Sequence, residues 1–206
     1  LQDGVRRILA SIDGRIAGYF DFMVAHNLFD LDSRVGKMAG GYMTTLSERR
    51  YPFIFMNAAG TSDDIVTLLH EHGHATHAFR TRLMEWDVYR HSTHEFSEVA
   101  SMSMELLGMK FFEEFYSAQQ REQAVAELLD RIVRVSFSWV AQIDAFQHWI
   151  YTHPDHTRVE RRAKWVELSR AYAGAGVDYT GLEHIEETYW HRQLHIFEMP
   201  FYYIEY

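Results

Sequence analysis

Apolar residues recur at the spacing of an α-helix along most of this 206-residue chain. One region departs from that pattern: residues 30–50 read as loop, and residues 42–45 and 51–57 predict two short strands joined as a hairpin. A hairpin of this size cannot bury a core alone, so the sequence predicts a mainly α fold. The expected helices span residues 4–28, 62–84, 95–116, 120–152, 155–173 and 178–198.

No shift in composition marks a linker between domains. The chain contains 3 Pro and 12 Gly and no stretch of low complexity. Pro154 and the run Gly174-Ala175-Gly176 are interpreted as boundaries between helices. Residues 1–206 are therefore expected to form a single catalytic-domain unit.

Charge and composition exclude several classes of function. A formal net charge of −9 argues against a nucleic-acid partner, because such binding depends on Lys and Arg that neutralise phosphates. The most apolar long stretch, residues 131–151, includes Arg131 and Asp144, so no membrane span is predicted. The absence of Cys excludes disulfides and thiolate ligands and leaves His and carboxylates as candidate metal ligands. These features favour a cytoplasmic protein.

The motif His-Glu-x-x-His occupies residues 70 to 74, inside the helix predicted over residues 62–84. Residues four apart on a helix differ in direction by about 40°, so the imidazoles of His70 and His74 converge on one point. Glu71 projects beside that point, where it can act as general base toward a metal-activated water. The motif predicts a catalytic zinc site, which typically takes three protein ligands and leaves a fourth position for water.

The residues alone leave the third zinc ligand open. Glu95, Glu98 and Glu105 belong to the next predicted helix, and each can supply a carboxylate. One of these carboxylates could ligate while another orients a ligating imidazole. His77 is a further candidate ligand, although it and His72 are better interpreted as surface groups or as groups beside the ligands.

Spacing alone is weak support for a metal site in a chain with 13 His, because His191 and His195 are also four residues apart. The pair in the motif differs because Glu71 stands in the required position and an acidic helix follows. The metzincin pattern would need Gly and His where this chain has His77 and Arg80, so that class is excluded.

Several segments follow one another in an order typical of one family. They are Gly36-Lys37 with Gly40-Gly41-Tyr42, Pro52 to Asn57 with Gly60-Thr61, the zinc motif, and Glu95-Phe96-Ser97-Glu98-Val99-Ala100-Ser101. In that order they resemble the oligoendopeptidase F branch of the M3 metallopeptidases, relatives of thimet oligopeptidase. The resemblance implies a multi-helix zincin-type catalytic domain with one Zn²⁺ bound by His70, His74 and Glu98. It also implies that Glu105 lies beside the ligands and supports them.

The C-terminal run from His191 to Tyr206 resembles the loop with which that family faces its substrate. The resemblance implies that His195, Tyr203 and Tyr206 donate hydrogen bonds to the oxyanion of the reaction, with His191 as the alternative to His195. Packing in an aromatic core is the alternative interpretation for each Tyr.

An extended peptide is expected to pair with the hairpin as an added strand, along the edge around residues 53–57. The expected substrate-binding residues are Gly41, Phe55, Asn57 and Tyr202.

The sequence therefore predicts a zinc-dependent endopeptidase that hydrolyses internal bonds of short oligopeptides, with Glu71 as general base. The alternatives are a carboxypeptidase-type exopeptidase and a non-catalytic helical interaction module with structural zinc or none. Members of the family that the chain resembles are much longer in both directions. The chain is accordingly expected to be a fragment of the catalytic domain, with peptides and the missing lobes of the same protein as its partners.

Overall fold

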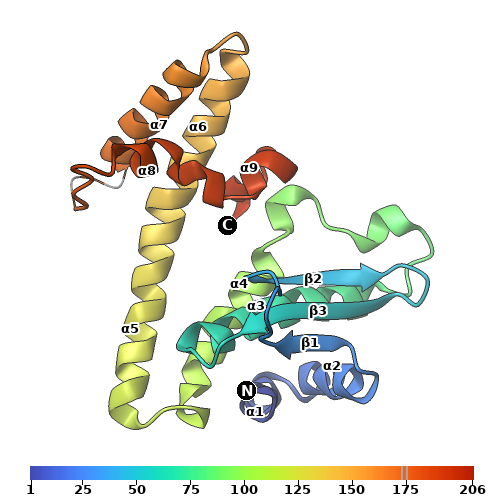
Figure 1. Cartoon of the computed structure of the whole chain (residues 1–206). Coiled ribbons are helices and arrows are strands. Elements are labelled where there is room, and N and C mark those ends of the chain that lie inside the picture. The colour runs from blue at the N-terminus through green and yellow to red at the C-terminus, as the bar shows by residue number, and fades with distance from the viewer. Residues whose placement is uncertain (173, 175) are drawn as a thin grey trace. The chain divides into compact units, whose positions relative to one another are not determined.

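Helices dominate the structure, a computed structural model, and confirm the mainly α fold (Figure 1). The structure describes residues 1–172, 174 and 176–206. The chain divides into two compact units, Leu1–Val125 and Ala126–Tyr206. The predicted end of the helix over residues 155–173 and the predicted boundary at residues 174–176 include residues 173 and 175, which lie outside the described residues.

The first unit combines a small sheet with helices that pack on it and on one another. Its strands are β1 (Phe29–Asp32), β2 (Gly41–Leu46) and β3 (Tyr51–Ala58). Its helices are α1 (Gln2–Ile12), α2 (Gly14–Ala25), α3 (Ser62–Thr81), α4 (Val99–Gly108) and the start of α5 (Ala118–Arg134). Short 3₁₀ helices span Asp87–Arg90, His94–Phe96 and Met109–Glu114.

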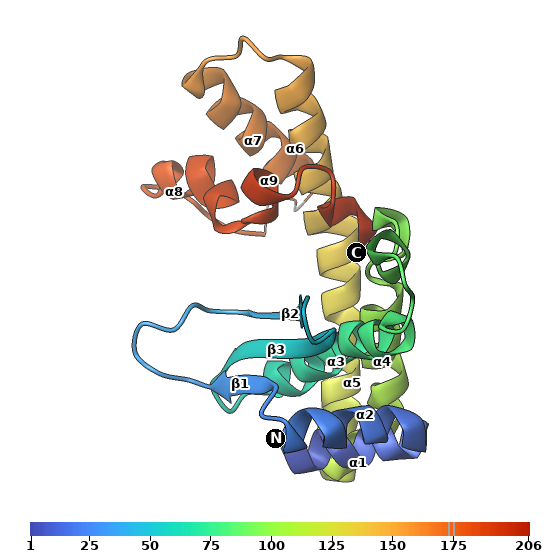
Figure 2. The ribbon, with the colours of Figure 1, turned by 90° about the vertical axis from the view of Figure 1, so that its right-hand side faces the viewer.

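The single helix predicted over residues 4–28 is wrong, because the chain breaks between α1 and α2, which pack against each other (Figure 2). The break lies at Asp13, whose backbone is extended at φ −160° and ψ 125°. The Asp13 carboxylate accepts a hydrogen bond from the backbone N–H of Arg15 at 2.7 Å and so caps α2. Short polar side chains favour this capping geometry over a continuous helix, and the apolar spacing does not register it.

The predicted hairpin is confirmed, and it belongs to a larger sheet. Strands β2 and β3 pair antiparallel, with Tyr42 opposite Phe55. Strand β1 lies in the region predicted as loop and pairs parallel with β3, so the strand order is β1-β3-β2. The four residues of β1 include two Asp, so their sequence gives little indication of a strand. They form a strand because they pair with β3, which lies far along the sequence.

The strand order corrects the prediction that residues 53–57 form the edge that receives a peptide. These residues belong to β3, which has neighbours on both sides. The edges of the sheet are β1 and β2, and of the two hairpin strands only β2 lies at an edge, where an added strand could pair.

Helix α3 carries the zinc motif and begins with a capping box. The side chain of Thr61 accepts from the backbone at the third helical position, and the carboxylate of Asp64 accepts from the backbone N–H of Thr61 at 2.8 Å. Two otherwise unsatisfied donors are thereby bonded, which fixes where the helix starts. The predicted start at about residue 62 is confirmed, and the helix ends at Thr81, three residues before the predicted end.

Helices α3 and α4 approach very closely at Gly73. A Cβ atom built on Gly73 would lie 2.5 Å from the carbonyl oxygen of Ala100 and 2.5 Å from the Cα of Ser101. Only a residue without a side chain allows this separation. The helix predicted over residues 95–116 is not continuous. Helix α4 starts at Val99, and a 3₁₀ helix lies on each side of it.

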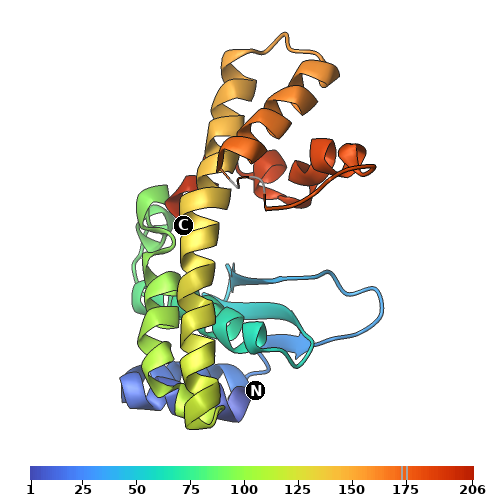
Figure 3. The ribbon, with the colours of Figure 1, turned by 90° about the vertical axis from the view of Figure 1, so that its left-hand side faces the viewer.

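Every regular element in the described part of the second unit is a helix or a helical turn. The end of α5 continues through a π-helical turn at Val135–Val140 into α6 (Ala141–Thr152), and α7 (Arg158–Tyr172) packs along α6 (Figure 3). Its core includes Phe146, which contacts both Trp165 and Trp190 at ring-centroid distances of 5.1 and 5.3 Å. The helix predicted over residues 120–152 is thus confirmed, apart from the π-helical turn.

The helix predicted over residues 178–198 is wrong. This segment contains α8 (Glu183–Thr188), a 3₁₀ helix at Tyr189–Arg192 and α9 (His195–Glu198), and a further 3₁₀ helix spans Tyr203–Glu205. Asp178 accepts from the backbone N–H of Thr180 at 2.9 Å, and Gly181 has a φ of +78°. Both features are turn geometry, and they delay the start of the helix.

Within the described residues, no helix combines the length and the apolar character that crossing a membrane requires.

Candidate metal centre

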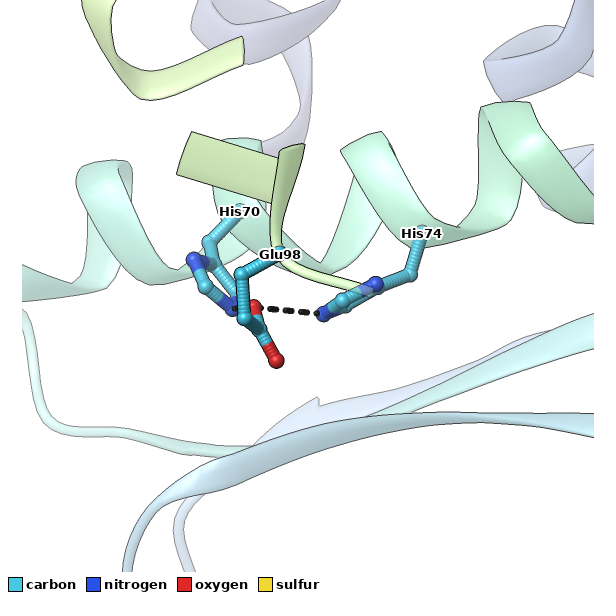
Figure 4. Close-up of side chains that lie close together, drawn as sticks. All are labelled: His70, His74 and Glu98. Carbon is cyan, nitrogen blue, oxygen red and sulfur yellow. Dashed lines mark ion pairs between the residues drawn. The ribbon is translucent and has the colours of Figure 1, made fainter. Parts of the chain in front are cut away.

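Three side chains from two elements converge within the first unit (Figure 4). His70 and His74 lie one turn apart on α3, and Glu98 immediately precedes α4. The Oε2 atom of Glu98 lies 3.2 Å from Nε2 of His70 and 3.3 Å from Nε2 of His74. The sequence motif therefore brings its two imidazoles together, and tertiary packing adds the carboxylate.

The geometry fits a zinc ion. One ligand atom from each residue lies within 4.8 Å of the other two. Zinc–ligand bonds of about 2.0–2.2 Å in a tetrahedron place neighbouring ligand atoms about 3.3 Å apart, which matches the two carboxylate–imidazole distances. Two imidazoles and one carboxylate are also a donor set that zinc uses in catalytic sites.

Glu105 contacts the ring nitrogen of His70 that faces away from His74 and Glu98. Its Oε1 atom lies 2.7 Å from Nδ1 of His70, and Glu105 follows Glu98 by about two helical turns. A carboxylate at Nδ1 leaves Nε2 as the nitrogen directed at the metal position. Glu105 thus contacts His70 as expected, and its supporting role stays a prediction.

Ser101 holds the carboxylate of Glu98. Its hydroxyl lies 2.6 Å from Oε2 and 2.9 Å from the backbone oxygen of Glu98, and both residues are buried. With a single proton to donate, the hydroxyl favours the anionic oxygen. Ser101 was not predicted as a site residue, although a hydroxyl residue three positions after a candidate ligand is a usable signal.

Hydrogen bonds and neighbouring charges shift the pKa values of His70 and Glu98. Burial alone would lower the pKa of His70, but hydrogen bonds with Glu105 and Glu98 raise that pKa to about 10. Burial would raise the pKa of Glu98, and hydrogen bonds from His70, His74 and Ser101 outweigh it and hold the pKa far below its usual range. Both shifts favour a protonated imidazole of His70 beside an ionised carboxylate of Glu98.

Glu71 lies on the same helix and is 6% exposed. Burial raises its pKa, while the charges of His70 and His74 act in the opposite direction. The backbone N–H of Met43, on β2, also hydrogen-bonds to Glu71 and lowers its pKa. A buried carboxylate with a raised pKa beside two metal-ligand candidates has the properties of a general base.

The remaining candidates on or near α3 and α4 do not join the group. Glu95 is exposed and precedes α4 by a full turn. His77 is half-buried, and burial, followed by the charges of His74 and His91, lowers its pKa. His72, interpreted from sequence as a surface or supporting group, is instead wholly buried, with Nε2 3.2 Å from the backbone oxygen of Ile16.

The outer edge of β2 presents main-chain groups beside Glu71. The N–H of Asn57 donates to the oxygen of Gly40 at 3.1 Å, so the ladder bonds of β2 fall at even-numbered positions. Pro52 has no N–H to donate, and it lies opposite Thr45, an odd-numbered position where β2 makes no hydrogen bond to β3. The main-chain groups that point away from β3 are those of Gly41, Met43 and Thr45.

The other residues expected to bind substrate make contacts within the protein. The Phe55 ring stacks on Tyr42 at a centroid distance of 5.0 Å, and the Nζ of Lys37 lies 4.7 Å from the same ring. The Asn57 amide nitrogen donates to the backbone oxygen of Lys37 at 3.3 Å. A Cβ on Gly41 would lie 2.9 Å from the side chain of Thr67. Contact with substrate stays a prediction for each of them.

In the second unit, the predicted C-terminal residues gather around one imidazole. The ring of His195 lies 4.8 Å from Tyr203, 5.8 Å from Tyr206 and 6.2 Å from Tyr202. Burial raises the pKa of Tyr203, and the nearby indole N–H of Trp139 acts in the opposite direction.

The alternative residue, His191, packs instead against Trp190 and Phe197. The structure thus groups His195 with the three Tyr, and their role in catalysis or substrate binding stays a prediction.

Comparison with known proteins gives a consistent family. The sequence model of peptidase family M3 matches residues 19–206. The solved structure of PZ peptidase A with an inhibitor is similar to the whole chain, at 33% identity and a TM-score of 0.91, over 36% of its own length.

Two curated relatives are oligoendopeptidases. Oligoendopeptidase F (chromosomal) of Lactococcus lactis subsp. cremoris is 36% identical over 76 residues, which cover 37% of this chain and 12% of the relative. An oligoendopeptidase F homolog of Mycoplasma genitalium is 25% identical over 191 residues, covering 86% of this chain and 30% of the relative. The chain therefore spans less than a third of the length of either relative.

Proposed function

Because the chain belongs to peptidase family M3, we propose that it carries the catalytic core of a zinc-dependent endopeptidase that cleaves internal bonds of short peptides. The observation that carries the proposal is the convergence of His70, His74 and Glu98, with Glu71 beside them. Cytoplasmic residence stays a prediction from composition.

His70, His74 and Glu98 would bind the zinc, and Glu105 and Ser101 would orient them. Bound zinc supplies Lewis-acid chemistry, which polarises the scissile carbonyl and lowers the pKa of water to about 7. Three protein ligands leave one coordination position for substrate or water, which is the pattern of catalytic rather than structural zinc.

Glu71 performs the proton transfers. Its carboxylate accepts a proton from the attacking water and then delivers that proton to the leaving amine of the cleaved peptide. Burial raises the pKa of Glu71 and brings it toward the range in which one group both accepts and donates a proton at neutral pH. The hydrogen bond from the N–H of Met43 orients the carboxylate.

The substrate backbone is proposed to pair with β2. An extended peptide can exchange hydrogen bonds with the outward main-chain groups at positions 41 and 45 and with the carbonyl oxygen of Met43, whose N–H is bonded to Glu71. Main-chain pairing needs no free terminus, which favours cleavage of internal bonds.

His195, Tyr203 and Tyr206 are proposed to donate hydrogen bonds to the oxyanion, and Tyr202 is proposed to contact the substrate. Their clustering in the second unit supports a shared role.

The proposal is tested with a peptide blocked at both termini. Wild-type protein should cleave it at an internal bond, whereas Glu71→Gln should bind zinc normally and lose about 100-fold or more in kcat, because a general acid–base group contributes about 10²–10⁴-fold. Zinc content and peptide products would be measured together.

The matched control is Glu122→Gln, which makes the same change at an exposed position of α5 and should be fully active. Full activity of Glu71→Gln would exclude the general-base role. Cleavage only of peptides with a free terminus would indicate an exopeptidase.

A further inference from the structure

Three side chains of the second unit form a line of hydrogen bonds that ends on His195. The indole Nε1 of Trp139 lies 3.0 Å from Oε1 of Gln193. The amide Nε2 of Gln193 in turn contacts Nδ1 of His195. Trp139 belongs to the π-helical turn, Gln193 is an extended residue before α9, and His195 begins that helix.

The chemistry of these groups determines the direction of each hydrogen bond. An indole N–H can only donate, so the atom of Gln193 that faces Trp139 must be the carbonyl oxygen. The amide NH₂ of Gln193 then faces His195 and donates, so Nδ1 must accept. A neutral imidazole that accepts at Nδ1 carries its proton on Nε2.

Neighbouring groups hold the first member of this line in place. The Trp139 ring packs edge-on against Trp165 and Tyr189, at centroid distances of 5.6 and 5.8 Å. The guanidinium of Arg192 lies 5.8 Å from the Trp139 ring. These contacts keep the indole N–H directed at Gln193, and through it they fix the amide orientation.

We propose that Gln193, oriented by Trp139, is a positioning residue that keeps neutral His195 in the tautomer with its proton on Nε2. The proposal deepens the proposed function and rests on it, because an Nε2–H is what His195 needs in order to donate to an oxyanion without being cationic. Gln193 itself acts only through His195.

The direct test is ¹⁵N NMR of the histidine rings in the purified protein, with the His195 signals assigned by their loss in His195→Gln. In wild type, Nε2 should carry the proton and Nδ1 should not. In Gln193→Glu the new carboxylate can only accept, so a proton should appear on Nδ1. Gln119→Glu, at an exposed position of α5, is the matched control and should leave the His195 signals unchanged.

The pH profile of peptide cleavage is the second readout. The titratable groups that pack on the His195 ring are the phenols of Tyr202, Tyr203 and Tyr206, and the guanidinium of Arg192 lies 5.8 Å from the Trp139 ring. Wild type should keep its activity as the pH rises above neutral, because the neutral ring still donates from Nε2. Gln193→Glu should lose kcat with rising pH, by about 100-fold, once its ring is neutral with the proton on Nδ1.

The possible results separate the two proposals. A wild-type ring with its proton on Nδ1, or a Gln193→Glu ring identical to wild type, overturns the tautomer assignment whether or not the protein cleaves peptides. A ring with the proton on Nε2 in a protein that binds zinc and cleaves no peptide supports the assignment and overturns the proposed function.

Discussion

His70 is the residue whose charge state zinc must change. In the metal-free protein, hydrogen bonds with Glu105 and Glu98 keep its imidazole protonated up to a pH of about 10. A nitrogen that ligates zinc cannot carry a proton, so the proton on Nε2 must leave when the metal binds. Protons and zinc therefore compete for one atom.

This competition predicts that zinc binding releases about one proton per site between pH 6 and 8, and that apparent affinity rises about tenfold per pH unit. The sign follows from the raised pKa, because His70 is protonated throughout this range without metal and deprotonated with it. Calorimetric titration in buffers of different ionisation enthalpy measures the number of protons released.

Glu105→Gln provides the comparison. It removes the carboxylate at Nδ1 of His70, so the pKa of His70 should fall and fewer protons should be released at pH 8. Binding without proton release in wild type would contradict the charge state assigned to His70.

At this scale, sequence predicted the residues that one helix brings together. The convergence of His70 and His74, with Glu71 beside them, follows from their places on one turn of a helix. Glu98 could be distinguished from its neighbours only through the resemblance to a family. The contacts of Ser101 and Met43 were not predicted, since they depend on how α4 and β2 pack on α3.

Among the elements, the crossing of α3 and α4 decides whether a third ligand is present. Gly73, between the two His ligand candidates, lies against the backbone of residues 100 and 101. Glu98 sits three residues before Ser101, so the helix separation at Gly73 sets the distance from Glu98 to the imidazoles.

Gly73→Ala should push the two helices apart, because the added Cβ would meet backbone atoms that cannot rotate away. We expect the free energy of unfolding to fall by about 1–3 kcal/mol. Zinc affinity should fall by about tenfold or more, as is usual when the support of a ligand is lost. Chemical denaturation and competition with a zinc chelator measure the two effects.

Gly18→Ala is the matched control, since a Cβ at this exposed position of α2 meets no atom within 4 Å. It should leave zinc affinity unchanged and stabilise the helix by up to about 1 kcal/mol. Wild-type zinc affinity in Gly73→Ala would show that the crossing does not set the site.

Element boundaries were predicted where local chemistry fixes them. The capping box at Thr61 and Asp64 made the start of α3 visible in the sequence. Strand β1 was missed because its partner, β3, lies more than twenty residues away along the chain. The break at Asp13 was missed because apolar spacing continues across a polar cap.

The whole molecule comprises two compact units, and each holds one part of the proposed chemistry. The metal-ligand group and Glu71 belong to the first unit, and the His195 cluster belongs to the second. The prediction of a single catalytic domain over residues 1–206 stays a prediction. So does activity of this chain alone, since the chain spans 36% of the length of PZ peptidase A.

The central claim is that His70, His74 and Glu98 bind one zinc ion and leave a coordination position open. Anomalous X-ray diffraction from zinc-loaded crystals, recorded on both sides of the zinc absorption edge, tests it most directly. We predict a single peak about 2.0–2.2 Å from Nε2 of both His and from one oxygen of Glu98, with no fourth protein ligand. The claim would be contradicted by the absence of a peak at these residues, or by a fourth side chain that closes the site.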